Sequence, residues 1–150
     1  MAQSLSKIII HIIFSTKQRA SLISNDIIPE LCSYIGGTLR ELDSQAIKIG
    51  ATEDHIHILC LLSKNIAVCS LVAEVKKRSS KWIKTKGAKY SDFQWQNGYC
   101  VFSVSQSIVK EVADYVAGQK ERHRRMSFQE EFRKFLEKHQ IAYDEEHVWG

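Results

Sequence analysis

The sequence has little that would divide it into several structural units. It contains one proline, Pro29, in 150 residues, and no Pro-, Gly- or Ser-rich tract that would predict a linker or a disordered tail. Hydrophobic residues make up 44% of the chain, which is enough to build a core of its own. We therefore expect a single domain over residues 1–150.

Long apolar runs and cysteine motifs are also missing. The longest apolar stretch near the N-terminus, residues 8–14, is interrupted by His11 and is far shorter than the roughly 18 residues that a membrane span needs. A basic segment follows it instead of a small-residue cleavage site, so no signal peptide is expected and the predicted location is the cytoplasm. The four cysteines form no CxxC pair and lie in apolar segments, which predicts reduced core residues.

Positive charge is modest in total, at +4, but it is concentrated in two groups. These groups are Lys76, Lys77, Arg78, Lys81, Lys84, Lys86 and Lys89, and then Lys120, Arg122, His123, Arg124 and Arg125. Such patches suit a polyanionic partner, because contacts with phosphates release counterions and supply most of the non-specific affinity for nucleic acid. Two solvated helix faces would give the same pattern.

Hydrophobic periodicity predicts the order β-α-β-β-α-β followed by further helices. The expected elements are a strand over 5–14, a helix over 27–42, strands over 45–50 and 55–62, a helix over 68–83, a strand over 99–104, and helices over 108–116 and 128–136. Asn25 or Asp26 is the expected N-cap of the first helix, with Pro29 in its first turn. This order is typical of the ferredoxin-like α+β fold, in which two helices connect the strands of an antiparallel sheet.

Two histidines are separated by one residue in Asp54-His55-Ile56-His57. Because side chains alternate across a strand, His55 and His57 are expected on one face and Ile56 on the other. Two neighbouring imidazoles can chelate a cation, and ligand type alone would permit zinc or nickel. Six histidines in 150 residues also give such a triplet by chance, so surface or hydrogen-bonded structural histidines are the alternative.

Tyr115 and Gln119 are four residues apart at the predicted third helix, so both should project from one helical face. A tyrosine oxygen can attack phosphorus and form a covalent phosphotyrosine that conserves the energy of the broken bond. A cation would polarise the phosphate and stabilise the charge that develops in the transition state. An ordinary core tyrosine with a solvated glutamine beside it is the alternative.

Several ordered blocks resemble the single-tyrosine HUH transposases, the insertion-sequence two-hundred-like family with its relatives associated with repetitive extragenic palindromes. The resemblance covers nearly the whole chain. It is carried by His11-Ile12-Ile13-Phe14-Ser15-Thr16-Lys17-Gln18-Arg19, Asp54-His55-Ile56-His57, Trp95-Gln96-Asn97-Gly98-Tyr99, Phe102-Ser103-Val104-Ser105, Tyr115 with Gln119, and Tyr143-Asp144-Glu145 near Trp149.

The resemblance implies the chemistry of the site. Magnesium or manganese would be bound by His55, His57 and Gln119, and Tyr115 would form a covalent 5′-phosphotyrosine with single-stranded DNA. It further implies a homodimer with two composite active sites, in which the tyrosine helix of one subunit can serve the histidine pair of the other; the sequence leaves open whether Tyr115 works in cis or in trans. Hairpins at the element ends would be the DNA partners, and their expected contacts are Arg19, Lys77, Arg78, Lys81 and Lys84.

The sequence departs from the family pattern at three places. The chain has Arg122-His123 where relatives often have two adjacent histidines, so any role of the first of these is absent or replaced. Gly118 precedes Gln119 and should loosen that helical turn, since glycine costs about 1 kcal/mol relative to alanine in a helix. Cys100 replaces a smaller residue, which indicates a packing change. None of these departures touches His55, His57 or Tyr115.

Two other functions share much of this pattern. A domesticated relative that nicks palindromic repeats without moving its own element would have the same site residues. A non-catalytic nucleic-acid-binding module is the contrasting class, because the βαββαβ topology also serves RNA-recognition domains that stack bases on sheet aromatics. The sequence lacks the basic-Gly-aromatic-Gly signature of those domains, and such a module would not need two histidines, a tyrosine and a glutamine.

Overall fold

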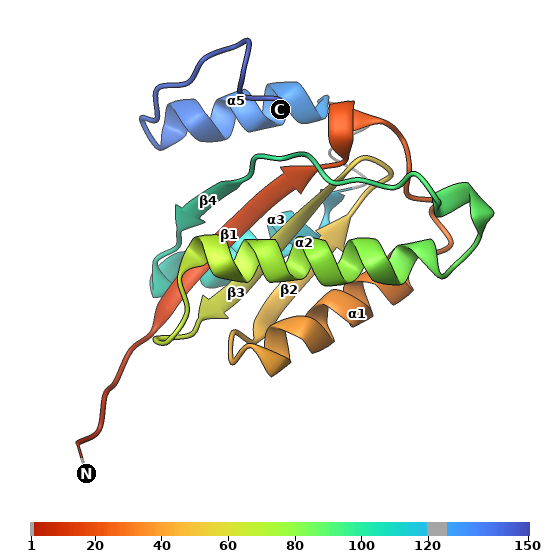
Figure 1. Cartoon of the computed structure of the whole chain (residues 1–150). Coiled ribbons are helices and arrows are strands. Elements are labelled where there is room, and N and C mark those ends of the chain that lie inside the picture. Colours follow the sequence, from red (N-terminus) through yellow and green to blue (C-terminus); the bar gives the residue numbers. More distant parts are fainter. Residues whose placement is uncertain (1, 120–125) are drawn as a thin grey trace.

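A computed structural model describes residues 2–119 and 126–150, which form a four-stranded antiparallel sheet with helices on both faces (Figure 1). The strands lie in the order β2-β3-β1-β4 and are β1 (Ile8–Ser15), β2 (Ala46–Ala51), β3 (His55–Leu62) and β4 (Cys100–Ser103). The helices are α1 (Ile28–Glu41), α2 (Val68–Lys84), α3 (Val109–Ala117) and α5 (Phe128–Lys138), with short 3₁₀ turns η1 (Lys17–Arg19), η2 (Ala88–Tyr90) and η3 (Gln106–Ile108). The predicted ferredoxin-like α+β fold is confirmed.

One face of the sheet is packed entirely by apolar side chains. Alternate residues of the two central strands point to this face, among them Ile12 of β1 and Ile58 of β3, both fully buried. The helices α1 and α2 cover it, with Leu31 and Leu71 in the same cluster (Figure 1). Full burial of each such side chain contributes about 1.5–3 kcal/mol, so this layer supplies most of the stability of the fold.

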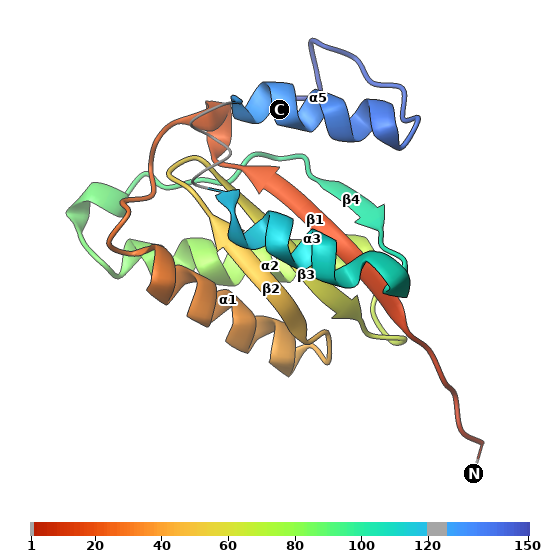
Figure 2. The same cartoon turned by 180° about the vertical axis from the view of Figure 1, so that it is seen from behind.

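The opposite face is covered by α3 and α5, which contact different parts of it (Figure 2). Val116 of α3 packs on Ile9 and Leu59, whereas Phe128 and Phe132 of α5 belong to a second cluster around the end of β1. The helix α3 can approach β2 closely because Gly50 has no side chain. A Cβ at that position would lie 2.0 Å from the carbonyl oxygen of Val116.

The segment after α5 returns along the molecule and is fastened to the loop before β4. The carbonyl oxygen of Gly150 accepts hydrogen bonds of 2.9 Å from the Gly98 amide and from Gln96 Nε2. The indole of Trp149 lies near the guanidinium groups of Arg19 and Arg133, at 5.5 and 5.2 Å from the ring centroid. These contacts hold α5 over its end of the sheet.

Three details differ from the expectations drawn from the sequence. The helix α1 is preceded by Ile27 at the N-cap position rather than by Asn25 or Asp26, because residues 25–27 form a turn ahead of Pro29. Cys60 is buried as predicted, but Cys69 is exposed and the other two cysteines are only partly buried; all four are free. The helix α3 stops at Ala117, with Gly118 at its C-cap.

The second basic group and the Arg122-His123 pair lie outside the described residues, which omit 120–125. Within the described parts of the chain, no helix has both the length and the apolar character that crossing a bilayer would require.

Candidate active site

His55 and His57 lie side by side on the face of the sheet that α3 and α5 cover. Their side chains are fully buried and their ring centroids are 5.3 Å apart, as the alternation of β3 predicts. Ile56, between them, points into the apolar layer under α1 and α2. The alternation of side chains along β3 alone therefore places the two imidazoles on the face opposite the apolar layer.

The ring of His55 is oriented by groups in the turn before β3. Its Nδ1 lies 2.7 Å from Asp54 Oδ1 and 2.8 Å from Thr52 Oγ1. An N–H on Nδ1 that donates to the carboxylate leaves the lone pair of Nε2 directed into the site. A carboxylate paired in this way with the far nitrogen is typical of histidines that bind metals, because it fixes both the ring and the tautomer.

A third histidine, His11 of β1, orients His57. His11 Nε2 lies 2.8 Å from His57 Nδ1, and both rings are buried. Burial, together with the neighbouring His57, lowers the pKa of His11 to about 3, so His11 is neutral around pH 7. A neutral His11 can accept a hydrogen bond from His57 Nδ1, which frees His57 Nε2 for the site.

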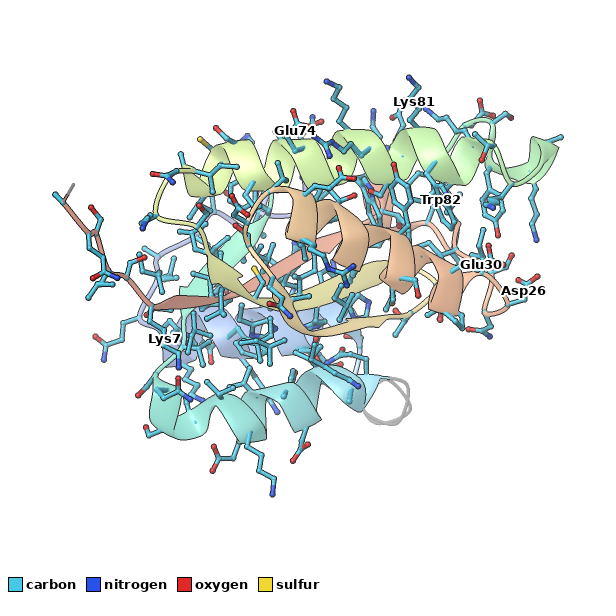
Figure 3. The ribbon with its side chains drawn as sticks, turned by 90° about the horizontal axis from the view of Figure 1, so that it is seen from below. Lys7, Asp26, Glu30, Glu74, Lys81 and Trp82 are labelled. Carbon is cyan, nitrogen blue, oxygen red and sulfur yellow. The ribbon has the colours of Figure 1, made fainter. Side chains whose placement is uncertain are left out.

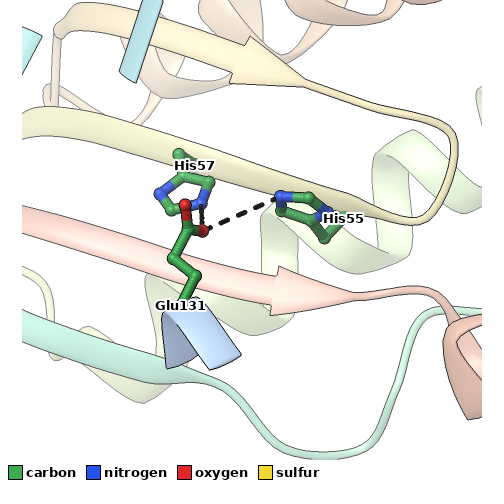
Figure 4. A group of neighbouring side chains, drawn as sticks. All are labelled: His55, His57 and Glu131. Atoms are coloured by element: carbon green, nitrogen blue, oxygen red, sulfur yellow. Dashed lines mark hydrogen bonds and ion pairs between the residues drawn. The ribbon is translucent and has the colours of Figure 1, made fainter. Parts of the chain in front are cut away.

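Glu131 of α5 inserts a carboxylate between the two histidines and is only 2% exposed (Figure 4). Its Oε1 is 2.8 Å from His57 Nε2 and 4.0 Å from His55 Nε2. These three residues form a buried group whose ligand atoms all lie within 4.8 Å of one another. The two oxygens of Glu131 have different partners, because Oε2 accepts a hydrogen bond from the hydroxyl of Tyr115.

Tyr115 and Gln119 both reach this group. The Tyr115 ring centroid is 5.8 Å from that of His57, and Gln119 Oε1 is 3.2 Å from His55 Nε2. Gln119 lies beyond the end of α3 but stays close to Tyr115 through a 3.2 Å hydrogen bond from its Nε2 to the Tyr115 carbonyl oxygen. The structure thus brings together all four residues that the sequence predicted as nucleophile and ligands, within one chain.

A cavity of about 1070 Å³ opens between α3 and α5 beside the tyrosine. Tyr115 and Glu131 lie in its wall, together with apolar groups such as Val112 and Phe135 and the basic Lys134 and Lys138. A phosphodiester that entered this cavity would meet the tyrosine hydroxyl and two cationic side chains. Tyr115 therefore borders an open cavity, although the histidines behind it are buried.

The donors around the histidines fit a divalent cation. Two imidazole nitrogens, one carboxylate oxygen and one amide oxygen converge, and the two closest pairs are 2.8 and 3.2 Å apart. Neighbouring ligands of an octahedral cation with bonds of about 2.1 Å are separated by about 3 Å, so these spacings suit a shared ion. The mixture of nitrogen and oxygen donors permits manganese and magnesium as well as softer metals.

The residues predicted to bind DNA lie elsewhere. Lys77, Lys81 and Lys84 are exposed on α2, on the opposite side of the sheet from the histidines, and Lys81 points away from the sheet (Figure 3). Arg78 is half-buried and pairs with Glu41 and Glu74 at 2.8 and 3.0 Å. Arg19 lies over Trp149. The structure therefore does not bring these basic residues to the tyrosine.

Two residues of this site were not singled out from the sequence. Glu131 belongs to a strongly charged helix, but it lies three residues after Phe128 and four before Phe135, so helical spacing could have placed it on the buried apolar stripe. His11 could have been found from strand alternation, because it points to the same face as Ile9 and Ile13 and therefore away from the apolar layer.

Comparison with known proteins agrees with this geometry. The family described as "Transposase IS200 like" matches residues 4–119. Among solved structures, a proposed transposase from Deinococcus radiodurans R1 superposes with a TM-score of 0.61 at 18% identity, over 77% of this chain and 95% of that one. A REP-associated tyrosine transposase bound to a REP hairpin gives 0.57 at 14% identity, over 82% of this chain and 74% of that one.

These two likenesses concern the fold, given their low identity. No curated protein matches the chain. The family match is stronger evidence, because it spans well over half of the sequence and includes the two histidines, the tyrosine and the glutamine. The chain belongs to the IS200-like transposase family.

Proposed function

We propose that the protein cleaves and rejoins single-stranded DNA with Tyr115 as nucleophile and a divalent cation, magnesium or manganese, held by His55, His57 and Gln119. The observation that carries the proposal is the meeting of these four side chains at one cavity: the tyrosine ring is 5.8 Å from the ring of His57, and Gln119 Oε1 is 3.2 Å from His55 Nε2. Family membership supplies the class of reaction.

The reaction is a transesterification that needs no nucleotide cofactor. The Tyr115 oxygen attacks the phosphorus of a scissile phosphodiester, the bond from phosphorus to the 3′ oxygen breaks, and the 5′ phosphate stays on the tyrosine. The phenol loses one proton and the departing 3′ oxygen gains one. A second 3′ hydroxyl reverses the step, which rejoins the strand and restores the phenol.

The cation, when bound, would polarise a non-bridging phosphate oxygen and stabilise the charge that develops on it. Asp54 and His11 keep the two histidine ligands in the tautomer that can donate to a metal. The apolar walls of the cavity, including Val112 and Phe135, limit the access of water that would hydrolyse the phosphotyrosine.

The proposal includes DNA hairpins as partners and a homodimer. Exposed lysines on α2 supply a basic surface for a duplex stem, and one similar structure is bound to a REP hairpin. In a dimer with composite sites, α3 would be exchanged so that Tyr115 makes the same contacts with the partner. Mixing a Tyr115→Phe chain with a His55→Ala chain tests this, because a restored adduct requires shared sites and its absence indicates that each chain uses its own tyrosine.

The direct test is incubation with labelled single-stranded DNA from the element ends, with and without Mn²⁺, followed by denaturing electrophoresis. We expect an SDS-resistant adduct that needs the metal and disappears in Tyr115→Phe. Tyr99→Phe is the matched control, because Tyr99 is a partly exposed tyrosine outside the site. Tight binding without an adduct under any metal would instead support a non-catalytic binding module.

The domesticated, palindrome-nicking function uses the same residues and predicts the same adduct. It differs only in the second step. If the adduct forms but is never resolved onto a new 3′ hydroxyl, nicking rather than transposition is the activity of this chain.

A further inference from the structure

Glu131 is the most unusual acidic residue of the described chain. It lies on α5, whose polar face is charged, yet it is 2% exposed, whereas Glu130 and Glu137 on the same helix are exposed. A carboxylate is almost never buried to this degree unless it is paired, because the loss of hydration costs several kcal/mol. Glu131 therefore occupies a buried position next to Phe132 and Phe128, where an apolar residue would be expected.

The partners of this carboxylate are two of the proposed cation ligands and the proposed nucleophile. Oε1 faces the imidazoles, at 2.8 Å from His57 Nε2 and 4.0 Å from His55 Nε2. Oε2 accepts the hydrogen bond of the Tyr115 hydroxyl. The same carboxylate therefore contacts both the tyrosine hydroxyl and the histidines.

We propose that Glu131 is a further active-site residue, which completes the cation site through Oε1 and positions the nucleophile through Oε2. This inference rests on the proposed function and adds α5 to the elements that build its site. One carboxylate then fixes the distance between the cation and the attacking oxygen.

The charge of the donor set supports this assignment. His55, His57 and Gln119 are neutral as ligands, so they offer no negative charge to a divalent cation. Manganese and magnesium prefer oxygen donors, and carboxylates most of all, over a site made only of imidazole and amide. Among the described residues, Glu131 supplies an anionic oxygen to this donor set, at a distance from His57 Nε2 that suits two ligands of one ion.

The geometry also explains why the tyrosine side chain points at the histidines. Tyr115 is on α3, next to Val116, which packs in the apolar cluster on the sheet, and the tyrosine ring faces the histidine rings of the sheet. Its ring is enclosed by Phe135 of α5, with 5.4 Å between ring centroids, and its hydroxyl is fixed by Glu131. Removal of the carboxylate leaves the ring in contact with Phe135 but removes the hydrogen bond that the hydroxyl donates to Glu131.

The experiment measures binding of Mn²⁺ alone, by calorimetry and by the electron paramagnetic resonance of the free ion, without DNA. The variants are Glu131→Gln, which keeps the shape and removes the charge, and Glu131→Asp, which keeps the charge on a shorter side chain. Glu137→Gln is the matched control on the exposed face of the same helix. Thermal unfolding of each variant verifies that it is folded.

We expect Glu131→Gln to weaken Mn²⁺ binding at least about tenfold, Glu131→Asp to weaken it less, and Glu137→Gln to leave it unchanged. At saturating Mn²⁺, Glu131→Gln should still form the adduct more slowly than the wild type, because the tyrosine hydroxyl is no longer positioned. The DNA concentration that gives half-maximal rate should not change.

Two results would overturn the inference. If Glu131→Gln binds Mn²⁺ as tightly as the wild type, the carboxylate is not a ligand. If it binds the ion more tightly or forms the adduct faster, Glu131 obstructs the site and does not build it. The proposed function fails separately, because Mn²⁺ binding that depends on Glu131 without any adduct would remove the strand-transfer activity and leave the cation site in place.

Discussion

The two faces of the sheet are built from the same strands, but one packs an apolar layer and the other carries the candidate active site. Under α1 and α2, every side chain contributed by the centre of β1 and β3 is apolar, and none has a polar atom to direct. Under α3 and α5, the neighbouring residues of the same strands are His11, His55 and His57, which are equally buried but are all hydrogen-bonded. The pleat of a strand therefore allows stability and chemistry to be encoded in alternate residues, with little interference between them.

The difference also extends to the outer surfaces. On the stable face, α2 presents exposed lysines to solvent, whereas on the histidine face the cavity between α3 and α5 leads to Tyr115. Recognition of a DNA stem and cleavage of a strand would then occur on opposite sides of one sheet. Variants at adjacent positions can separate these roles.

The largest effect is expected for His55→Ala. Loss of one imidazole ligand should lower the rate of adduct formation at least about a thousandfold, which corresponds to about 4 kcal/mol of transition-state stabilisation. Rates are measured in Mn²⁺ with single-stranded DNA, and Ile56→Val, the next residue on the opposite face, is the control. If His55→Ala stayed within tenfold of the wild type, the histidine face would have no catalytic role.

Ile58→Ala should destabilise the apolar layer under α1 and α2. Removal of a fully buried side chain from the apolar layer should lower the free energy of unfolding by about 3 kcal/mol, through lost burial and the cavity that remains. Urea unfolding measures the loss. Mn²⁺ affinity of the folded variant should be unchanged, and a parallel loss of ion binding would contradict the separation of the two faces.

The histidine face should also be the one that responds to acid. The pKa of His11 is lowered to about 3 in the folded chain, so below about pH 6.5 the unfolded chain binds a proton that the folded chain does not bind. The free energy of unfolding therefore decreases as the pH is lowered through this range. Between about pH 6.5 and pH 5 the loss from this group is about 2 kcal/mol.

The measurement is urea unfolding at the two pH values without divalent cation. His11→Gln should lose about 2 kcal/mol less than the wild type over that interval, and His147→Asn, at an exposed position, is the control. An identical loss in His11→Gln and the wild type would assign the acid sensitivity to other groups.

The smallest effect is expected on α2. Lys77→Ala and Lys81→Ala should each weaken hairpin binding several-fold and lower the slope of log affinity against log salt by about 1, because in the proposed complex each lysine would contact a phosphate. The rate at saturating DNA should not change. Lys7→Ala is the control, since Lys7 lies near the N-terminus and away from α2 (Figure 3). A changed saturated rate would mean that the two faces are coupled.

The sequence was informative wherever one local rule decided the structure. Alternation along β3 predicts that His55 and His57 share a face, and the structure confirms it. Tyr115 and Gln119 meet at one site as their spacing predicts, but α3 stops at Ala117 and a hydrogen bond to the Tyr115 carbonyl oxygen keeps Gln119 near the tyrosine. The fold class follows from the same patterns and is confirmed.

Tertiary placement decided the rest. Helical spacing places Glu131 on the apolar stripe of α5, unlike Glu130 and Glu137, but its contact with the histidines depends on how that helix lies across the end of β1. His11 meets His57 only through the register in which Ile13 pairs with His57. The predicted N-cap of α1 was wrong, because residues 25–27 form a turn and the helix begins at Ile28.

The close packing of α3 on Gly50 and of α5 on Phe102 has a consequence for the order in which the molecule opens. The site depends on α3 and α5 staying docked on the sheet, because Gln119 and Glu131 reach the histidines of β3 only in that arrangement. A fluctuation that lifts α3 or α5 would disassemble the site while the layer under α1 and α2 stays intact. Amide exchange should therefore be faster in these two helices than in β1 and β3, and a bound substrate would be expected to slow it.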